Sequence, residues 1–468
     1  MTNSARDPRP GPGAPLRAGA AASSTDYAEV ELPRVAAGDP AAELSLIDDG
    51  ALTRRSILPG GVRVITESVP GLRSTAIGLW LGVGSRDEAP GQEGSTHFLE
   101  HLLFKGTPTR DAHGIAEAFD MIGGESNAAT SKEHTSYYAR VLAPDAMGAL
   151  DVVADMVTSS LLDPNEVETE RGVIVSELAD AADDPADVAQ EAFARAAFGE
   201  GTPLGRPIGG TYETVTAVPR DAVWEHYRRT YTSDALVVAV AGAVDHDEVC
   251  QRVSADLAAA GWDDSSSAPP RQRRFETEPF SPLSVQDVTV PRDVEQSHVY
   301  LTCQGLAVRD ERRWTMSVLT TILGGGMSSR LFQEVREKRG LAYTTFAFDT
   351  SYAGAGAFGL YAGCAPHHVE EVCAVMIGEF EKLAEHGPSE HEMARARGQI
   401  RGSLVLGGED SLARMGRLGR AEVTTGRLRS MGENLRLLQE VTAEDVRALA
   451  SWLVSQERAR VLVGPEDD

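Results

Sequence analysis

The chain has 468 residues, and 44 Lys and Arg against 70 Asp and Glu give it a formal net charge of −26 at pH 7. Proteins that bind nucleic-acid phosphates cluster Lys and Arg, so this balance argues against a nucleic-acid partner and favours a basic or neutral one. Hydrophobic residues make up 42% of the chain, which is enough for sizeable cores, and the length predicts roughly two to four domains.

The location of the protein is predicted from what its sequence lacks. No segment approaches the roughly 18 uncharged apolar residues of a membrane span. The four cysteines, Cys250, Cys303, Cys364 and Cys373, form no CxxC pair, so neither a disulfide framework nor a Cys-based metal site is predicted. We expect a cytoplasmic protein without a membrane partner. Residues 1–48 are predicted to form a disordered tail, and a transit peptide, the alternative, is opposed by its prolines.

Alternating strands and helices follow the tail. Strands are predicted over 63–67 and 74–83, separated by the turn Pro70-Gly71. Helical patterns cover 95–104, 114–122, 145–161, 165–180 and 186–198, and a buried strand covers 235–242. Between 261 and 291 the composition shifts to Asp, Ser, Pro and Arg, which predicts a linker at 266–290.

The residues after this linker repeat those before it. Pro164 to Arg171 matches Pro388 to Arg395 at an offset of 224, and Val215-Thr216-Ala217 matches Val441-Thr442-Ala443 at an offset of 226. Each of the latter motifs precedes an amphipathic helix and an apolar strand. The pattern predicts an α+β fold built from two homologous domains, 49–265 and 291–468.

The sharpest chemical signal is His97-Phe98-Leu99-Glu100-His101. On a helix, residues i and i+4 lie one above the other, so His97 and His101 present two imidazoles to one point, with Glu100 beside them. Two neutral imidazoles are good zinc ligands and leave room for a third protein ligand and a water. This HxxEH order is the mirror of HExxH. The alternative interpretation is a helix surface with two solvated histidines.

The repeat helps to choose a third ligand among the carboxylates of segment 166–177. The second copy keeps Glu166 and Glu168 as glutamates but has Ala394 and Arg401 where the first has Glu170 and Glu177. It also lacks the histidines, so Glu170 and Glu177 are the carboxylates tied to the metal. They are seven residues apart on one helical face, so one of them can be a ligand while the other lies behind it.

These motifs resemble the insulinase and pitrilysin family of zinc peptidases, in the half-length branch related to the mitochondrial processing peptidase. The resemblance covers nearly the whole chain after residue 50, and it rests on the following segments: 94–107, with Glu177 lying 76 residues after His101, 123–131, 170–177, and 323–332 continuing to Arg336 and Tyr343. It implies one Zn²⁺ per chain held by His97, His101 and Glu177. It also implies that Glu100 is the general base and that Glu170 is a carboxylate behind the ligands.

The resemblance further implies how a substrate is bound. The segment Asn127, Ala128, Ala129 and Thr130 corresponds to the family's edge strand, to which an extended peptide adds as a further strand. Arg336 and Tyr343 correspond to residues that contact the substrate carbonyl and the oxyanion. Gly324, Gly325 and Gly326 form a loop that lies across the chamber from the metal. His134 is expected to be structural.

From these observations we expect a zinc metalloendopeptidase that cleaves unfolded, preferably basic peptides. The family chamber has four homologous domains and this chain has two, so the fold is expected to be half of a clamshell, closed by a homodimer, or by a heterodimer as the alternative. Arg336 and Tyr343 would then serve the other subunit. A non-catalytic subunit that binds peptides or assembles with an active partner is the competing hypothesis, which the intact metal residues oppose.

Overall fold

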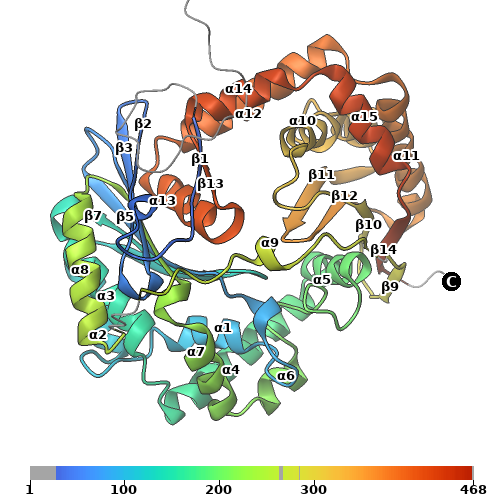
Figure 1. The fold of residues 1–468 in the computed structure, drawn as a ribbon. Helices are drawn as coiled ribbons and strands as arrows, with labels where there is room; N and C mark the ends of the chain where they lie inside the picture. The colour runs from blue at the N-terminus through green and yellow to red at the C-terminus, as the bar shows by residue number, and fades with distance from the viewer. Residues whose placement is uncertain (1–27, 263–266, 284, 466–468) are drawn as a thin grey trace, which may run out of the picture.

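The computed structural model describes residues 28–262, 267–283 and 285–465, and they form two halves with the same strand order (Figure 1). The N-terminal sheet runs β2(Leu44–Asp48), β3(Ala51–Ile57), β4(Arg63–Ser68), β8(Leu236–Gly242), β5(Ser74–Leu81), β7(Thr135–Leu142) and β6(Glu125–Thr130). All neighbours in it are antiparallel except β4 and β8, which are parallel. Strand β6 is an edge strand.

The C-terminal sheet repeats five of these strands in the same spatial order. It runs β11(Ala342–Tyr352), β12(Ala355–Cys364), β10(Ser297–Gln304), β14(Arg458–Gly464) and β9(Val288–Pro291). Its single parallel pair, β14 with β9, corresponds to β8 with β4. The repeated topology is the structural counterpart of the sequence repeat. The N-terminal half adds only the hairpin β2–β3 at the far side of its sheet.

Helices cover each sheet. In the N-terminal half they are α1(Ser95–Leu102), α2(Ala112–Ile122), α3(Ala146–Ser159), α4(Pro164–Asp183), α5(Pro185–Phe198), α6(Tyr212–Ala217), α7(Arg220–Thr230) and α8(His246–Ala259). From the linker onward they are α9(Arg274–Thr277), α10(Arg313–Gly324), α11(Val369–His386), α12(Glu390–Gly407), α13(Ser411–Arg420), α14(Met431–Glu440) and α15(Ala443–Val454). None of the helices within the described ranges is long and apolar enough to cross a membrane.

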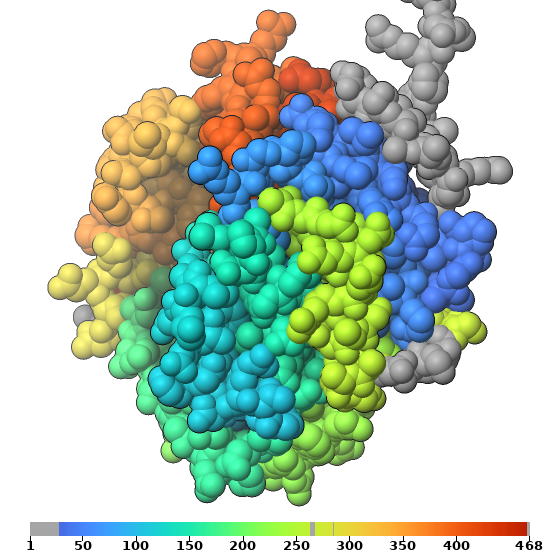
Figure 2. Space-filling view, turned by 90° about the vertical axis from the view of Figure 1, so that its left-hand side faces the viewer, coloured from blue at the N-terminus to red at the C-terminus, as the bar shows by residue number. Residues whose placement is uncertain are grey.

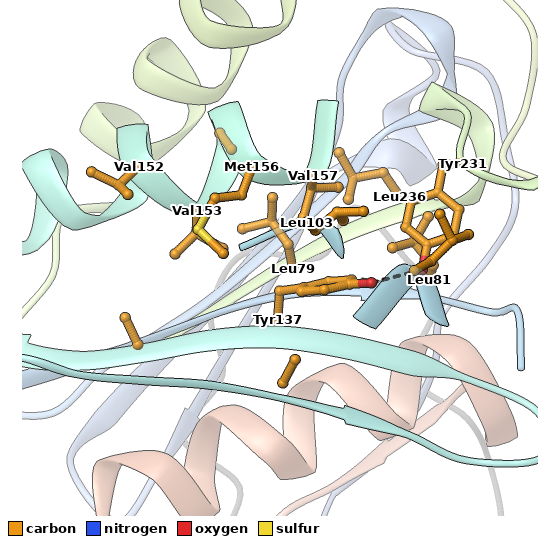
Figure 3. Packing of buried hydrophobic residues seen from close by; sticks show 14 of the residues in the cluster. Leu79, Leu81, Leu103, Tyr137, Val152, Val153, Met156, Val157, Tyr231 and Leu236 are labelled. Carbon is orange, nitrogen blue, oxygen red and sulfur yellow. Dashed lines mark hydrogen bonds between the residues drawn. The ribbon is translucent and has the colours of Figure 1, made fainter. Parts of the chain in front are cut away.

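The core of the N-terminal half lies between its sheet and α3. Leu79 of β5 lies next to Val153 and Met156 of α3, and Leu81 lies beside Tyr231 and Leu236 in the same cluster (Figure 3). The ring of Tyr137 is fully buried in this cluster, and its hydroxyl is hydrogen-bonded to that of Tyr231 at 3.0 Å. Helix α8 packs beside α3 and contributes Val249 and Val253 to the same core (Figure 2). This packing gives α1 a rigid support.

Each half lends a helix to the other. Helix α13, from the C-terminal half, packs on β5, β8 and β4 of the N-terminal sheet, whereas α5, from the N-terminal half, packs on β14, β10 and β9 (Figure 1). The first contact buries Met415 and Leu418 against Trp80, and the second buries Phe193 against Tyr300. The exchange joins the two halves through apolar surface on both sides.

A buried ion cluster reinforces the α13 contact. Glu422, in the π-helical turn Ala421–Thr425 after α13, is fully buried and bonded to Arg55 of β3 and Arg273 of the linker. Burial by itself raises the pKa of Glu422, but Arg55 and Arg273 outweigh it and lower the pKa to about 2. The carboxylate therefore stays ionised and ties three distant segments together.

Two predictions about the connecting segments need correction. The expected tail of residues 1–48 is too long, because β2 pairs with β3 and β1(Glu29–Glu31) pairs with β13(Arg427–Arg429). Glu29 is ion-paired with Arg429 across the β1–β13 pair, and the apolar alternation in Leu44–Asp48 suits a sheet. Residues 1–27 lie outside the described part. The linker of 266–290 is also structured where it is described, since it contains α9, the start of β9 and the buried Arg273.

Candidate metal centre

Helix α1 carries the two histidines, and a distant carboxylate caps its N-terminus. Its N-cap residue is Gly94, with φ of 91°, which has no side chain to cap the helix. The side chain of Glu88 does so instead, accepting hydrogen bonds from the backbone N–H of Thr96 at 2.7 Å and of Gly94 at 3.0 Å. Burial raises the pKa of Glu88 to about 7 against the opposing effect of these hydrogen bonds.

One face of α1 is apolar, which turns the histidines toward the other. Phe98, Leu99 and Leu102 are all buried in the N-terminal core. His97 and His101 are one turn apart, with ring centroids 4.8 Å from each other. The helix ends at Leu102, two residues before the predicted end at Phe104. The i, i+4 geometry predicted for the two imidazoles is therefore present.

Helix α4 brings Glu177 to the same point. The Oε2 atom of Glu177 lies 3.5 Å from Nε2 of His101 and 3.9 Å from Nε2 of His97, and these three side chains form a candidate metal-binding group. The ligand atoms of a tetrahedral zinc site are about 3.3 Å apart. Glu177 lies close to that spacing from both rings, and the three ligand atoms, which all lie within 4.8 Å of one another, would draw together around such an ion. The Glu177 side chain is 48% exposed, which leaves the centre open on one side.

The electrostatics of the two rings suit a cation. Burial, and then the proximity of His101, lower the pKa of His97, so the neutral imidazole that a metal requires is favoured. In addition, Nδ1 of His101 lies 3.1 Å from Oε2 of Glu170. Since a carboxylate only accepts, Nδ1 carries the hydrogen, and the lone pair of Nε2 faces Glu177.

The repeat did not decide which of Glu170 and Glu177 is the ligand and which lies behind it, and their positions in the structure now differ in this way. Glu177 is at the centre, whereas Glu170 lies behind His101 and is only 3% exposed. The second oxygen of Glu170, Oε1, lies 2.6 Å from Nζ of Lys105. Lys105 was not singled out by sequence reasoning, although its position four residues after His101 places it near the end of the same helix.

Glu100 points toward the edge strand. Its Oε2 accepts a hydrogen bond of 2.5 Å from the hydroxyl of Thr130, the last residue of β6. Sequence reasoning assigned Thr130 to substrate binding and did not predict this contact. Thr130, Ala128 and Ser126 share one side of β6 by the alternation of a strand, and Ala128 packs in the same core as α1. The edge strand is therefore fixed relative to Glu100.

The remaining predicted edge residues lie on the same open strand. Asn127 and Ala129 are exposed, and among the described strands only β7 pairs with β6. The backbone N–H of Ala128 donates to the side chain of Asn127 at 2.8 Å. This geometry leaves the outer edge of β6 free to pair with an extended chain.

The C-terminal candidates form a separate group. Arg336 stacks on the ring of Tyr343 at 4.3 Å, and Tyr343 is exposed. No contact within the described ranges joins either residue to the metal-binding group. The close approach of α10 to β11 explains why residue 324 is a glycine. A Cβ at Gly324 would lie 2.0 Å from the backbone nitrogen of Ala347. Gly325 and Gly326 continue this helix end.

Fold and site together define the class of protein: a duplicated α+β chain that carries a His-His-Glu group in its first half. A family model described as Insulinase (Peptidase family M16) matches residues 63–212, and one described as Peptidase M16 inactive domain matches residues 217–400. The first segment contains the whole metal-binding group and the second contains none of it.

Individual relatives agree over almost the full length. A protein of Streptomyces coelicolor named an uncharacterized zinc protease is 46% identical over 89% of this chain and 90% of its own. The uncharacterized zinc protease YmxG of Bacillus subtilis is 37% identical over 88% and 98%. The chain therefore belongs to the insulinase family, peptidase family M16, which confirms the resemblance inferred from the motifs.

Solved structures share the fold. The structure of a protease from Helicobacter pylori superposes with a TM-score of 0.79 at 21% identity, covering 88% of this chain and 99% of that one. A peptidase M16 inactive domain from Pseudomonas fluorescens gives a TM-score of 0.78 at 19% identity, with 89% and 98% coverage. The predicted α+β fold, with mixed sheets flanked by helices, is confirmed.

Proposed function

We propose that the protein is a zinc-dependent metalloendopeptidase that hydrolyses unfolded peptides. The observation that carries the proposal is the convergence of His97, His101 and Glu177 within 4.8 Å, with Glu100 on the same helix. These residues would hold one zinc ion per chain, because two imidazole nitrogens and a carboxylate oxygen are zinc's preferred ligands. The names of the relatives, which call them zinc proteases, support this metal.

The residues of the chain would divide the work of hydrolysis. When bound, zinc supplies a Lewis acid that polarises the scissile carbonyl and makes a nearby water more acidic. Glu100 takes the proton of the attacking water and later delivers it to the leaving amine. Thr130 holds the carboxylate of Glu100, and Glu170 holds the ring of His101. The open side at Glu177 admits the substrate.

The substrate would be an extended peptide lying along β6, next to Asn127, Ala128 and Ala129. Main-chain hydrogen bonds to an edge strand accept many sequences but require an unfolded segment. Beyond Glu177, the exposed residues Asp180, Asp183, Asp184 and Asp187 form no ion pair within the described chain. This surface and the net charge of −26 favour basic peptides.

We propose a homodimer as the working form, with a heterodimer as the alternative. Arg336 and Tyr343 form a pair of groups suited to a developing oxyanion, and they make no described contact with the metal-binding group of their own chain. A second copy could supply them. We also propose a cytoplasmic location; all four cysteines are free thiols, as a reducing compartment requires.

The test is peptide cleavage by the wild type and by Glu100→Gln, together with zinc analysis of both proteins. We expect about one zinc per chain in each, and a roughly 100-fold to 10,000-fold lower rate in the variant, which lacks the proton acceptor. Activity of the wild type should vanish with a chelator and return with zinc. Full activity of Glu100→Gln would refute the role of Glu100.

The competing hypothesis of a non-catalytic subunit is tested in the same experiment. It has some support, because the model matching residues 217–400 is described as an inactive domain. A wild type that contains no zinc and cleaves no member of a mixed peptide library would favour it. Sedimentation of the active protein tests the dimer, since a fully active monomer would contradict the proposed sharing of Arg336 and Tyr343.

A further inference from the structure

Glu170 is a buried carboxylate that touches two residues at the end of the metal helix. Its Oε2 lies 3.1 Å from Nδ1 of His101 and its Oε1 lies 2.6 Å from Nζ of Lys105. The side chain of Glu170 is 4% exposed and that of Lys105 is 31% exposed. Both oxygens of one carboxylate are thus engaged, one by a candidate ligand and one by an ammonium group that reaches in from the surface.

A buried carboxylate is costly unless it is paired and hydrogen-bonded. Within the described ranges, Lys105 is the only Lys or Arg that forms an ion pair with Glu170. The adjacent Arg171 is engaged elsewhere, since it pairs with Glu168 and donates to the carbonyl of Val215. The position of the Glu170 carboxylate therefore depends on Lys105.

We infer that Lys105 is a positioning residue for the metal centre, acting through Glu170 on His101. By holding Oε1, it fixes the plane of the carboxylate so that Oε2 receives the Nδ1 hydrogen of His101. This hydrogen bond sets the tautomer in which Nε2 has a free lone pair, and Nε2 is the atom that lies 3.5 Å from Glu177. Lys105 makes no described contact with Glu177 or His97.

The inference rests on the proposed function only in taking the metal to be zinc. Partners that orient a metal-ligating histidine contribute about 10-fold to 100-fold to metal affinity. Because Lys105 makes no described contact with His101, its effect on zinc affinity should depend entirely on Glu170. This requirement separates a positioning role from a general contribution to folding or charge.

The experiment measures the zinc dissociation constant by chelator competition, without substrate, for the wild type, Lys105→Met and Lys105→Arg. We expect Lys105→Met to weaken zinc binding about 10-fold to 100-fold and Lys105→Arg to restore most of it, because the ion pair is kept. Lys382→Met is the matched control, since Lys382 pairs with the buried Glu379 at the same 2.6 Å in the C-terminal half. It should leave zinc affinity unchanged.

A double variant guards against a misfolded single variant. Lys105→Met with Glu170→Gln leaves no unpaired buried charge, and it should bind zinc as Glu170→Gln alone does, because the two residues act in series. Zinc affinities of Lys105→Met within about 3-fold of wild type, or losses that multiply in the double variant, would overturn the inference. A wild type that binds zinc but cleaves no peptide would contradict the proposed function without contradicting the role of Lys105 in zinc binding.

Discussion

The two halves of the molecule use the same kind of ion pair for different ends. In the C-terminal half, Arg330 pairs with Glu392 at 2.7 Å, and the other oxygen of Glu392 accepts from the backbone N–H of Ser389 at the start of its own helix. In the N-terminal half, Lys105 pairs with Glu170, whose other oxygen meets His101. The two pairs do not occupy equivalent positions, since Glu392 corresponds in the repeat to Glu168 and Ala394 to Glu170. The pair in the N-terminal half is the one directed at a metal ligand.

The helices that precede these pairs differ accordingly. Helix α10 ends at Gly324, which has no side chain and packs directly on β11. Helix α1 has histidines on its free face and meets β6 through the hydrogen bond between Glu100 and Thr130. The C-terminal half therefore has close backbone packing at the position where the N-terminal half has its metal-binding side chains. Four predictions test this difference.

The largest effect should come from the third ligand. Glu177→Gln removes an anionic ligand of the metal. The metal stabilises the transition state by several kcal/mol, so its loss should lower the rate of peptide cleavage by at least about 1,000-fold. Zinc content and peptide cleavage check it. Arg401→Gln, at the corresponding position of the second half, is the control and should behave as wild type. Equal losses in the two variants would contradict the division of labour.

The second effect concerns the contact between the halves. Glu422 is fully buried between Arg55 and Arg273, so Glu422→Gln leaves buried positive charge without its partner and should lower the free energy of unfolding by about 3–5 kcal/mol. Urea denaturation measures it. Glu444→Gln, which removes an exposed pair with Arg447, should leave the free energy of unfolding nearly unchanged, because water screens an exposed pair. Similar costs would show that the ion cluster adds little to the apolar contact of α13.

The third effect is a pH dependence. Burial raises the pKa of Glu88 from 4.5 to about 7, so the folded state binds the proton more tightly and stability falls as pH rises from about 4.5 to 7. The shift corresponds to about 3 kcal/mol. Buried histidines such as His226, whose pKa is lowered to about 4, act in the opposite sense.

The difference between wild type and Glu88→Gln isolates the carboxylate. The unfolding free energy of the variant relative to wild type should rise between pH 5 and pH 8, because glutamine does not titrate. Denaturation curves at these two pH values are sufficient. A constant difference would mean that Glu88 stays in one protonation state over the range.

The smallest effect tests the contact between Thr130 and Glu100. Thr130→Val keeps the shape of the side chain and removes the hydroxyl, so the base loses its fixed orientation and kcat should fall about 10-fold, a modest part of the contribution of a general base. Zinc content should not change, and Thr130→Ser should retain activity. Thr350→Val, five residues before β12 as Thr130 is before β7, is the control in the other half.

Much of this architecture follows from local sequence. The spacing of His97 and His101 predicts their shared face, and the repeat singles out Glu170 and Glu177 because the second copy lacks both. The contact of Thr130 with Glu100 could not be predicted, because it depends on how closely β6 approaches α1. The capping of α1 by Glu88 could not be predicted either, because a single glutamate in a loop forms no recognisable capping motif.

The exchange of α5 and α13 was also invisible in the sequence. The apolar residues of α13, such as Met415 and Leu418, predict burial but not the sheet that buries them. The segment containing Arg273 has a linker's composition, yet this arginine is buried because it meets Glu422, which is 149 residues further along the chain. The periodicity of apolar residues shows which face of a helix or strand is buried. The element that covers this face is known only from the tertiary structure.

The pairing of β1 with β13 has a consequence for biosynthesis. Glu29 and Arg429 are separated by 400 residues, so the first strand must wait for nearly the whole chain before it finds its neighbour. At about 5–20 residues per second, a ribosome needs about 20–80 s to cover that distance. The nascent first half therefore leaves the ribosome with an unsatisfied strand and with the face of its sheet that α13 covers still bare, and it depends on the arrival of the second half to become protected.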